Sequence, residues 1–73
     1  MRKTYALEDL DCANCAAKME RKIKKIKGVT DAEVSFMAQK MTLEAPDDLF
    51  EAVVDEAVGL IAKIEPDCKV IGR

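Results

Sequence analysis

The sequence contains no histidine and no tryptophan, and its only aromatic residues are Tyr5, Phe36 and Phe50. It also lacks a phosphate-binding glycine loop and an aspartate in a recognisable ATPase phosphorylation motif. No catalytic constellation is therefore visible, because histidine is the side chain most often used for general acid–base catalysis. We expect that this domain is not itself an enzyme.

Long apolar runs are missing too, and no signal-peptide pattern opens the chain. The formal net charge is −2, so we expect no general attraction to nucleic acid or to anionic lipid. The length of 73 residues suffices for one small domain with one modest core. We predict a single domain over residues 1–73 that is monomeric and cytosolic, with no nucleic-acid partner and no membrane insertion.

Alternating and helical apolar patterns predict the secondary structure. Period-two alternation predicts strands, and apolar residues three and four apart predict helices with one buried stripe, which includes Met19 in the first helix. Gly28 and Pro66 are expected to end the two helices. The predicted elements are a strand at Lys3–Asp9, a helix at Asn14–Lys27, strands at Thr30–Phe36 and Lys40–Glu44, a helix from Pro46-Asp47-Asp48 to Pro66, and a strand at Asp67–Ile71.

The order of these elements predicts the α+β class and a ferredoxin-like βαββαβ sandwich. We expect a four-stranded antiparallel sheet in the order 4-1-3-2, with both helices on one face. In this topology three connections meet at one end of the sheet. They are residues 11–15, 37–39 and 65–68.

Cys12 and Cys15 form a CxxC motif at the point where the first helix begins. A helix N-terminus favours negative charge and lowers the pKa of a thiol, so two thiolates at this spacing can hold one soft metal ion. The same spacing suits a redox pair, but a thioredoxin-like protein needs a longer chain and another strand order. Three cysteines, an odd number, argue against a secreted disulfide scaffold. A structural zinc site would use four protein ligands, which this sequence does not group together.

The stretches LDCANC and AAKMERKI, followed by Gly28-Val29, resemble the heavy-metal-associated domain. This family occurs in soluble metallochaperones and at the N-termini of metal-transporting P-type ATPases. The resemblance covers the whole chain and looks closest to zinc, cadmium and lead exporters. In those domains an aspartate often precedes the first cysteine, whereas copper members commonly carry threonine or histidine there. The ending KIEPDCKV is similar to cadmium-exporter domains, although Cys68 stands where an apolar residue is usual. A second departure is Asp9, where many members have glycine.

The resemblance implies that Asp11 is a metal ligand together with Cys12 and Cys15. Zn²⁺ accepts sulfur and carboxylate oxygen together, whereas Cu(I) prefers sulfur alone. The alternative is that Asp11 caps the helix or stabilises its dipole. Cys68 is a candidate additional ligand, with a core-facing thiol as the favoured alternative. Met37 is at the same end, where an ordinary turn residue is the simpler interpretation.

Three functions remain open from the sequence. The leading one is the N-terminal domain of a P-type ATPase that binds Zn²⁺, Cd²⁺ or Pb²⁺, with the rest of the ATPase or another metal-binding domain as partner. The second is a freestanding metallochaperone, including one for Cu(I), and the third is a thiol oxidoreductase. Lys18 and Arg21 begin a basic stretch that could dock an acidic partner; the alternative is a solvated helix face.

Overall fold

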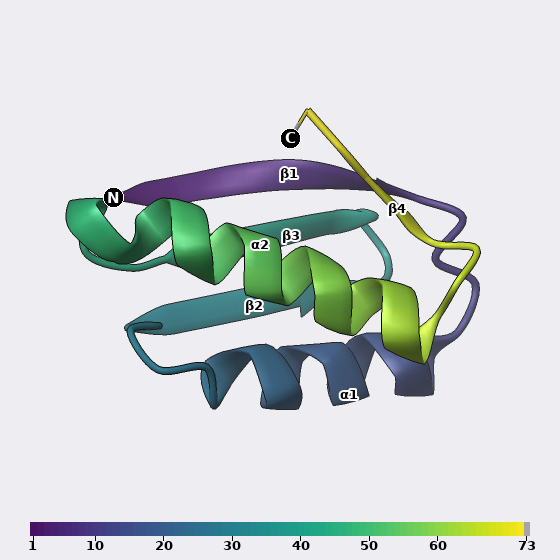
Figure 1. Cartoon of the computed structure of the whole chain (residues 1–73). Helices are drawn as coiled ribbons and strands as arrows, with labels where there is room; N and C mark the ends of the chain where they lie inside the picture. Colours follow the sequence, from purple (N-terminus) through teal and green to yellow (C-terminus); the bar gives the residue numbers. More distant parts are fainter. Residues whose placement is uncertain (73) are drawn as a thin grey trace.

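The computed structural model describes residues 1–72 and contains the six predicted elements in the predicted order. Figure 1 shows the two helices packed side by side on one face of the sheet. Our ferredoxin-like assignment is therefore confirmed. The elements are β1 (Arg2–Glu8), α1 (Ala13–Lys24), β2 (Asp31–Ser35), β3 (Lys40–Glu44), α2 (Asp47–Ile64) and β4 (Lys69–Ile71).

The sheet has the strand order β2-β3-β1-β4, which is the predicted 4-1-3-2 read from the other edge. All three pairings are antiparallel, with Tyr5 opposite Met41 and Leu7 opposite Val70. This register places the side chains of Tyr5, Leu7 and Met41 on the face that the helices cover. Within residues 1–72, neither helix has the length and apolar character that crossing a membrane would require.

One continuous core fills the space between the sheet and the helices. Met19, Ile23, Met41 and Leu43 are fully buried, and Tyr5 is also buried, so the predicted core positions are confirmed. Burying each large apolar side chain contributes about 1.5–3 kcal/mol relative to leaving it exposed. The core therefore packs the helices against the sheet beneath the loops.

Several predicted bounds differ from the structure by one to three residues, and two of these differences have a clear cause. Helix α1 ends at Lys24 rather than Lys27, and the chain continues through tighter turns in which Lys25 and Ile26 donate to carbonyls three residues back, at 3.1 and 3.0 Å. These turns keep Ile26 packed against the core, so the apolar spacing outlasts the helix. Strand β4 begins at Lys69 rather than Asp67, because the Cys68 N–H closes a turn onto the Glu65 carbonyl at 3.0 Å.

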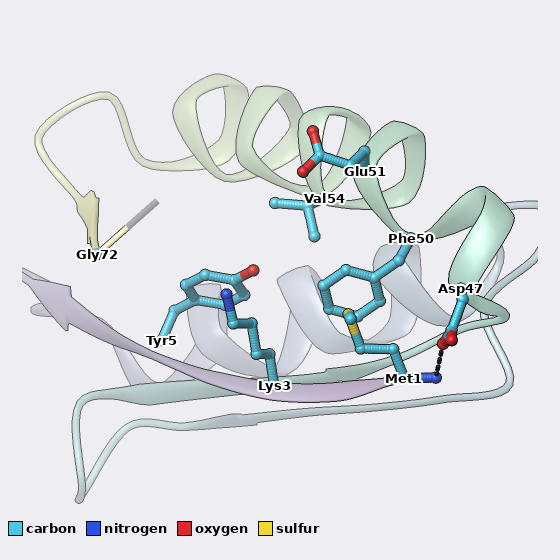
Figure 2. Close-up of a pocket in the computed structure, with 8 residues that line it drawn as sticks. All are labelled: Met1, Lys3, Tyr5, Asp47, Phe50, Glu51, Val54 and Gly72. Atoms are coloured by element: carbon cyan, nitrogen blue, oxygen red, sulfur yellow. Dashed lines mark ion pairs between the residues drawn. The ribbon is translucent and has the colours of Figure 1, made fainter.

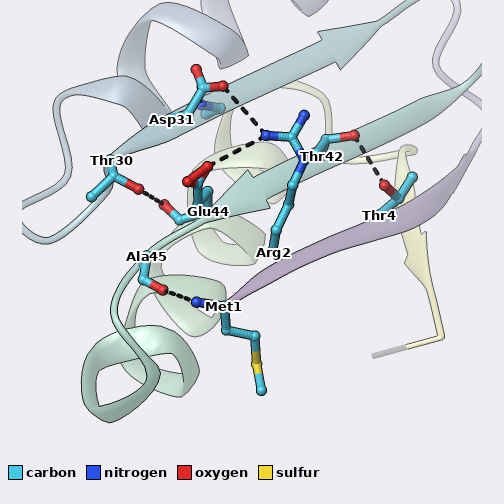
Figure 3. Close-up of polar contacts among 9 residues, drawn as sticks. Met1, Arg2, Thr4, Thr30, Asp31, Thr42, Glu44 and Ala45 are labelled. Carbon is cyan, nitrogen blue, oxygen red and sulfur yellow. Dashed lines mark hydrogen bonds and ion pairs between the residues drawn. The ribbon is translucent and has the colours of Figure 1, made fainter.

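The β1–α1, β2–β3 and α2–β4 connections all lie at one end of the molecule, as predicted (Figure 1). At the other end of the molecule, polar contacts join the start of the chain to β2, β3 and the connection that follows β3 (Figure 3). There the Met1 ammonium donates to the Ala45 carbonyl at 2.7 Å and pairs with Asp47 at 3.0 Å. Arg2 pairs with Glu44 on the open face of the sheet at 3.4 Å. Exposed pairs of this kind each contribute about 0–1 kcal/mol, so they orient the chain more than they stabilise it.

Strand β4 is short, and within residues 1–72 it pairs only with Ala6–Glu8 of β1. The first half of β1 therefore has a neighbouring strand on one side alone. A hollow of about 240 Å³ lies between this half of β1 and the first half of α2 (Figure 2). Its wall includes the rings of Tyr5 and Phe50, and no cysteine lines it.

Candidate metal centre

Cys12 is the N-cap residue of α1, and Cys15 lies in the first turn of the helix. The Cys15 N–H donates to the Cys12 sulfur at 3.2 Å, and the Ala16 N–H donates to the Cys12 carbonyl at 3.0 Å. The predicted placement of both cysteines is therefore confirmed. The capping alternative for Asp11 was wrong, because the sulfur of Cys12 occupies the capping position.

The two thiols have opposite electrostatic environments, although both are half-buried. The pKa of Cys12 is lowered, first by a hydrogen bond from the Cys15 thiol and then by the backbone N–H groups of Cys15 and Asn14. The pKa of Cys15 is raised to about 12 by its hydrogen bond to Cys12, by burial and by the carboxylate of Glu65. Cys12 is thus the more readily deprotonated thiol of the pair, and Cys15 holds its proton more strongly against an incoming metal ion.

Glu65 is a site residue to which the sequence analysis assigned no role. It lies directly after α2, and its carboxylate contributes to raising the pKa of the Cys15 thiol. Its negative charge partly offsets the lowering of the Cys12 pKa, and it adds to burial in raising the pKa of Cys68. The topology placed residues 65–68 at this end of the molecule, but only the three-dimensional path of the chain brings the carboxylate to Cys15. Glu65 is therefore a carboxylate close to the two thiols.

Asp11 is exposed and directly precedes Cys12. The pKa of Cys68, which is raised mainly by burial, is raised further by the charge of Asp11 among others. Within the described residues 1–72, no three histidine, cysteine, aspartate or glutamate side chains are already arranged to hold a metal ion. The donors are therefore two adjacent thiols with carboxylates on the neighbouring loops. The role of Asp11 as a ligand stays a prediction.

Cys68 is 5% exposed and belongs to the hydrophobic core cluster. The pKa of its thiol is raised mainly by burial, and further by the charges of Glu65, Asp9 and Asp11. The expectation of a core-facing thiol agrees with this burial, although Cys68 precedes β4 rather than lying in it. Its role as an additional ligand stays untested. Met37 is 90% exposed at the tip of the β2–β3 turn.

The loop before Cys12 has a tight backbone. Asp9 adopts a φ of 62°, in the left-handed region where glycine is the usual residue. Asp9 therefore keeps the backbone conformation that a glycine would adopt there. The next side chain, Leu10, is 2% exposed and packs beneath the loop.

Comparison with known proteins identifies the family. Residues 4–69 match the heavy-metal-associated domain. Over 70 residues the chain is 33% identical to the cadmium, zinc and cobalt-transporting ATPase of Bacillus subtilis strain 168, covering 96% of this chain and 10% of that protein. Over 57 residues it is 33% identical to the zinc/cadmium/lead-transporting P-type ATPase of Shigella sonnei, covering 78% of this chain and 8% of that protein. The chain thus spans a tenth or less of the length of these relatives.

A solved structure supports the same assignment. The N-terminal domain of a potential copper-translocating P-type ATPase from Bacillus subtilis, in its Cu(I)-loaded state, superimposes with a TM-score of 0.74 at 29% sequence identity. The match covers 94% of this chain and 84% of that domain. With the family matched over residues 4–69 and the fold shared with this domain, the chain belongs to the heavy-metal-associated domain family.

Proposed function

We propose that this chain is the metal-binding domain of a metal-exporting P-type ATPase and binds Zn²⁺, Cd²⁺ or Pb²⁺ through Cys12 and Cys15, with Asp11 as an oxygen ligand. The observation that carries this proposal is the thiol pair at the start of α1. The Cys12 sulfur accepts the Cys15 N–H, and its pKa is lowered. A thiolate held at a helix N-terminus is a ready ligand for a soft or borderline cation.

The carboxylates around the thiols favour a divalent ion. With both thiols deprotonated, Asp11, Cys12 and Cys15 together carry a charge near −3, which a divalent ion neutralises more fully than a monovalent one. Glu65 adds a further negative charge against Cys15. Mixed sulfur and oxygen donors suit Zn²⁺ better than Cu(I), which prefers sulfur in low coordination. The two ATPase relatives transport cadmium and zinc, which points in the same direction.

Cu(I) is the second candidate ion, because the Bacillus subtilis copper domain shares the fold at 29% identity. A freestanding metallochaperone would use the same fold and the same thiol pair. The sequence of the parent gene separates these alternatives, since an ATPase would continue into membrane-spanning segments. In the ATPase, transport and ATP hydrolysis belong to other domains, and this one acquires or hands over the ion.

A metal-competition titration of the reduced chain tests the proposal. Zn²⁺, Cd²⁺, Pb²⁺ and Cu(I) are each titrated against a chelator, and thiolate ligation is followed by the ultraviolet charge-transfer absorption of the Cd²⁺ complex. The double variant Cys12→Ser/Cys15→Ser is expected to lose tight binding while remaining folded, because the core lies beneath the loop. Tight Cd²⁺ binding by this variant would refute the site. The divalent assignment would be refuted if the chain preferred Cu(I) over the divalent ions more strongly than a chelator whose ligands are all thiolates.

A further inference from the structure

The side chain of Gln39 joins the β2–β3 turn to the loop that carries Cys12. Its amide nitrogen donates to the Leu10 carbonyl at 2.7 Å, and its amide oxygen accepts the Leu10 N–H at 3.2 Å. The same nitrogen donates to the Phe36 carbonyl at 2.9 Å. A side-chain amide that binds both polar groups of one residue holds its backbone as a neighbouring strand would.

The backbone of Gln39 adds a fourth bond, since its carbonyl accepts the Leu7 N–H at 2.7 Å. Gln39 is therefore bonded at both edges of the turn at Asp9. The N–H and C=O of Leu10 lie in a part-buried loop with no strand partner, where leaving them unpaired would be costly. Gln39 supplies the partners that this loop needs.

Gln39 itself adopts a φ of 54°, in the left-handed region, as does Asp9 at 62°. This conformation is disfavoured for residues with a Cβ atom and persists where the surroundings over-determine it. Such positions cluster at functional sites. Here both occur within the hydrogen-bonded unit that ends two residues before Cys12.

We propose that Gln39 is a positioning residue of the metal site. It fixes the backbone at Leu10 and so sets where Asp11 and Cys12 stand relative to Cys15, without touching the metal ion. This inference rests on the proposed function. Without the hydrogen bonds from Gln39, the loop would become ordered only when the metal ion binds. Metal affinity would then fall, because binding would carry the free-energy cost of ordering the loop. Partners that orient ligands in this way typically change metal affinity by about 10- to 100-fold.

Gln39→Asn is the sharpest variant. Asparagine tolerates the left-handed conformation, so the turn is expected to form, but its side chain is one methylene too short to reach Leu10. Gln39→Met keeps the length and removes all the side-chain hydrogen bonds. The matched control is Ser35→Ala, which deletes the 3.1 Å bond from the Ala38 N–H to the Ser35 hydroxyl in the same turn. It leaves Leu10 untouched.

Cd²⁺ affinity, the denaturation midpoint and amide hydrogen exchange at Leu10 are measured for each variant and for the wild type. We expect Gln39→Asn to bind Cd²⁺ about tenfold or more weakly while it is still fully folded under the assay conditions. Its denaturation midpoint should be lowered, because the polar groups of Leu10 lose their partners, and exchange at Leu10 should be faster in the metal-free chain. Ser35→Ala should match the wild type in all three. The inference is overturned if folded Gln39→Asn binds as tightly as the wild type, or if Ser35→Ala loses as much affinity.

A different result marks failure of the proposed function instead. If the wild type itself binds no Cd²⁺ through its thiols, the metal site is wrong. Hydrogen exchange at Leu10 then still decides whether Gln39 positions the loop, because that measurement needs no metal. Should Gln39→Met fail to fold, Gln39→Asn carries the test alone.

Discussion

The unequal acidity of the two site thiols leads to a prediction about chemical modification. In the reduced, metal-free chain, limiting iodoacetamide near pH 8 is expected to alkylate Cys12 well before Cys15. The Cys12 thiolate is stabilised by hydrogen bonds, whereas Cys15 holds its proton between Cys12 and Glu65. Thiolates, and not thiols, are the attacking species.

The expected ratio follows from the pKa of Cys15, which is about 12 against an ordinary value of 9.0. Near pH 8 this difference reduces the thiolate fraction by about 1,000-fold. The more basic thiolate is also the better nucleophile. With a Brønsted coefficient of about 0.4 to 0.5, its intrinsic reactivity is about 20-fold higher, which offsets part of the loss. Cys15 should therefore react about 50-fold more slowly than an ordinary thiol. Cys12, whose pKa is lowered, should react faster than Cys15.

Peptide mapping by mass spectrometry after less than one equivalent of reagent gives the two initial rates. The control is Cys12→Ser, which removes the sulfur that accepts the hydrogen bond of the Cys15 thiol. In that variant Cys15 should react many times faster than in the wild type. Equal initial rates for the two cysteines in the wild type, or no acceleration in Cys12→Ser, would refute the assigned hydrogen bonding.

Three further predictions concern the metal, the partner and pH. Asp11→Ala should weaken Zn²⁺ binding by more than Cu(I) binding in competition titrations, since Cu(I) does not need an oxygen ligand; equal losses would remove Asp11 from the ligand set. Lys18→Glu should slow metal transfer to an acidic partner domain and flatten its salt dependence in stopped-flow measurements. Lys25→Glu, just beyond the C-terminal end of the same helix and farther from the thiols, should not; equal effects would point to net charge alone. The metal-free chain should lose stability in denaturant titrations as the pH rises above 9, because the unfolded Cys68 thiol releases its proton at its ordinary pKa while the folded thiol, whose pKa is raised, retains it. Cys68→Val should lose less over that range, and an identical loss would assign the effect elsewhere.

The sequence predicted the features that depend on local periodicity. Tyr5 and Leu7 alternate, and Met19 and Ile23 share a helical stripe, so the strands, the helices and their order could be inferred. The same signal misplaced the end of α1, because Ile26 continues the apolar spacing in a turn that is no longer α-helical.

Contacts between segments that are distant in the sequence could not be predicted from local patterns. Gln39 is 29 residues from Leu10 and looks like any polar turn residue until the fold brings the two together. Glu65 likewise gains its meaning from where α2 ends relative to Cys15. The CxxC motif could be found because its two members are neighbours on one helix turn. The groups that surround it could not, because their positions depend on tertiary packing.

The brevity of β4 has a consequence for how the molecule fluctuates. A three-residue edge strand that pairs only with Ala6–Glu8 can detach locally at a small fraction of the free energy of global unfolding. Cys68 directly precedes this strand and is covered while the strand is in place. Each detachment would uncover the thiol for an instant and leave the rest of the sheet paired. The rate at which a thiol reagent modifies Cys68 would then report how often this sheet edge opens locally. The chain thus contains a natural probe of local opening beside the metal-site loop.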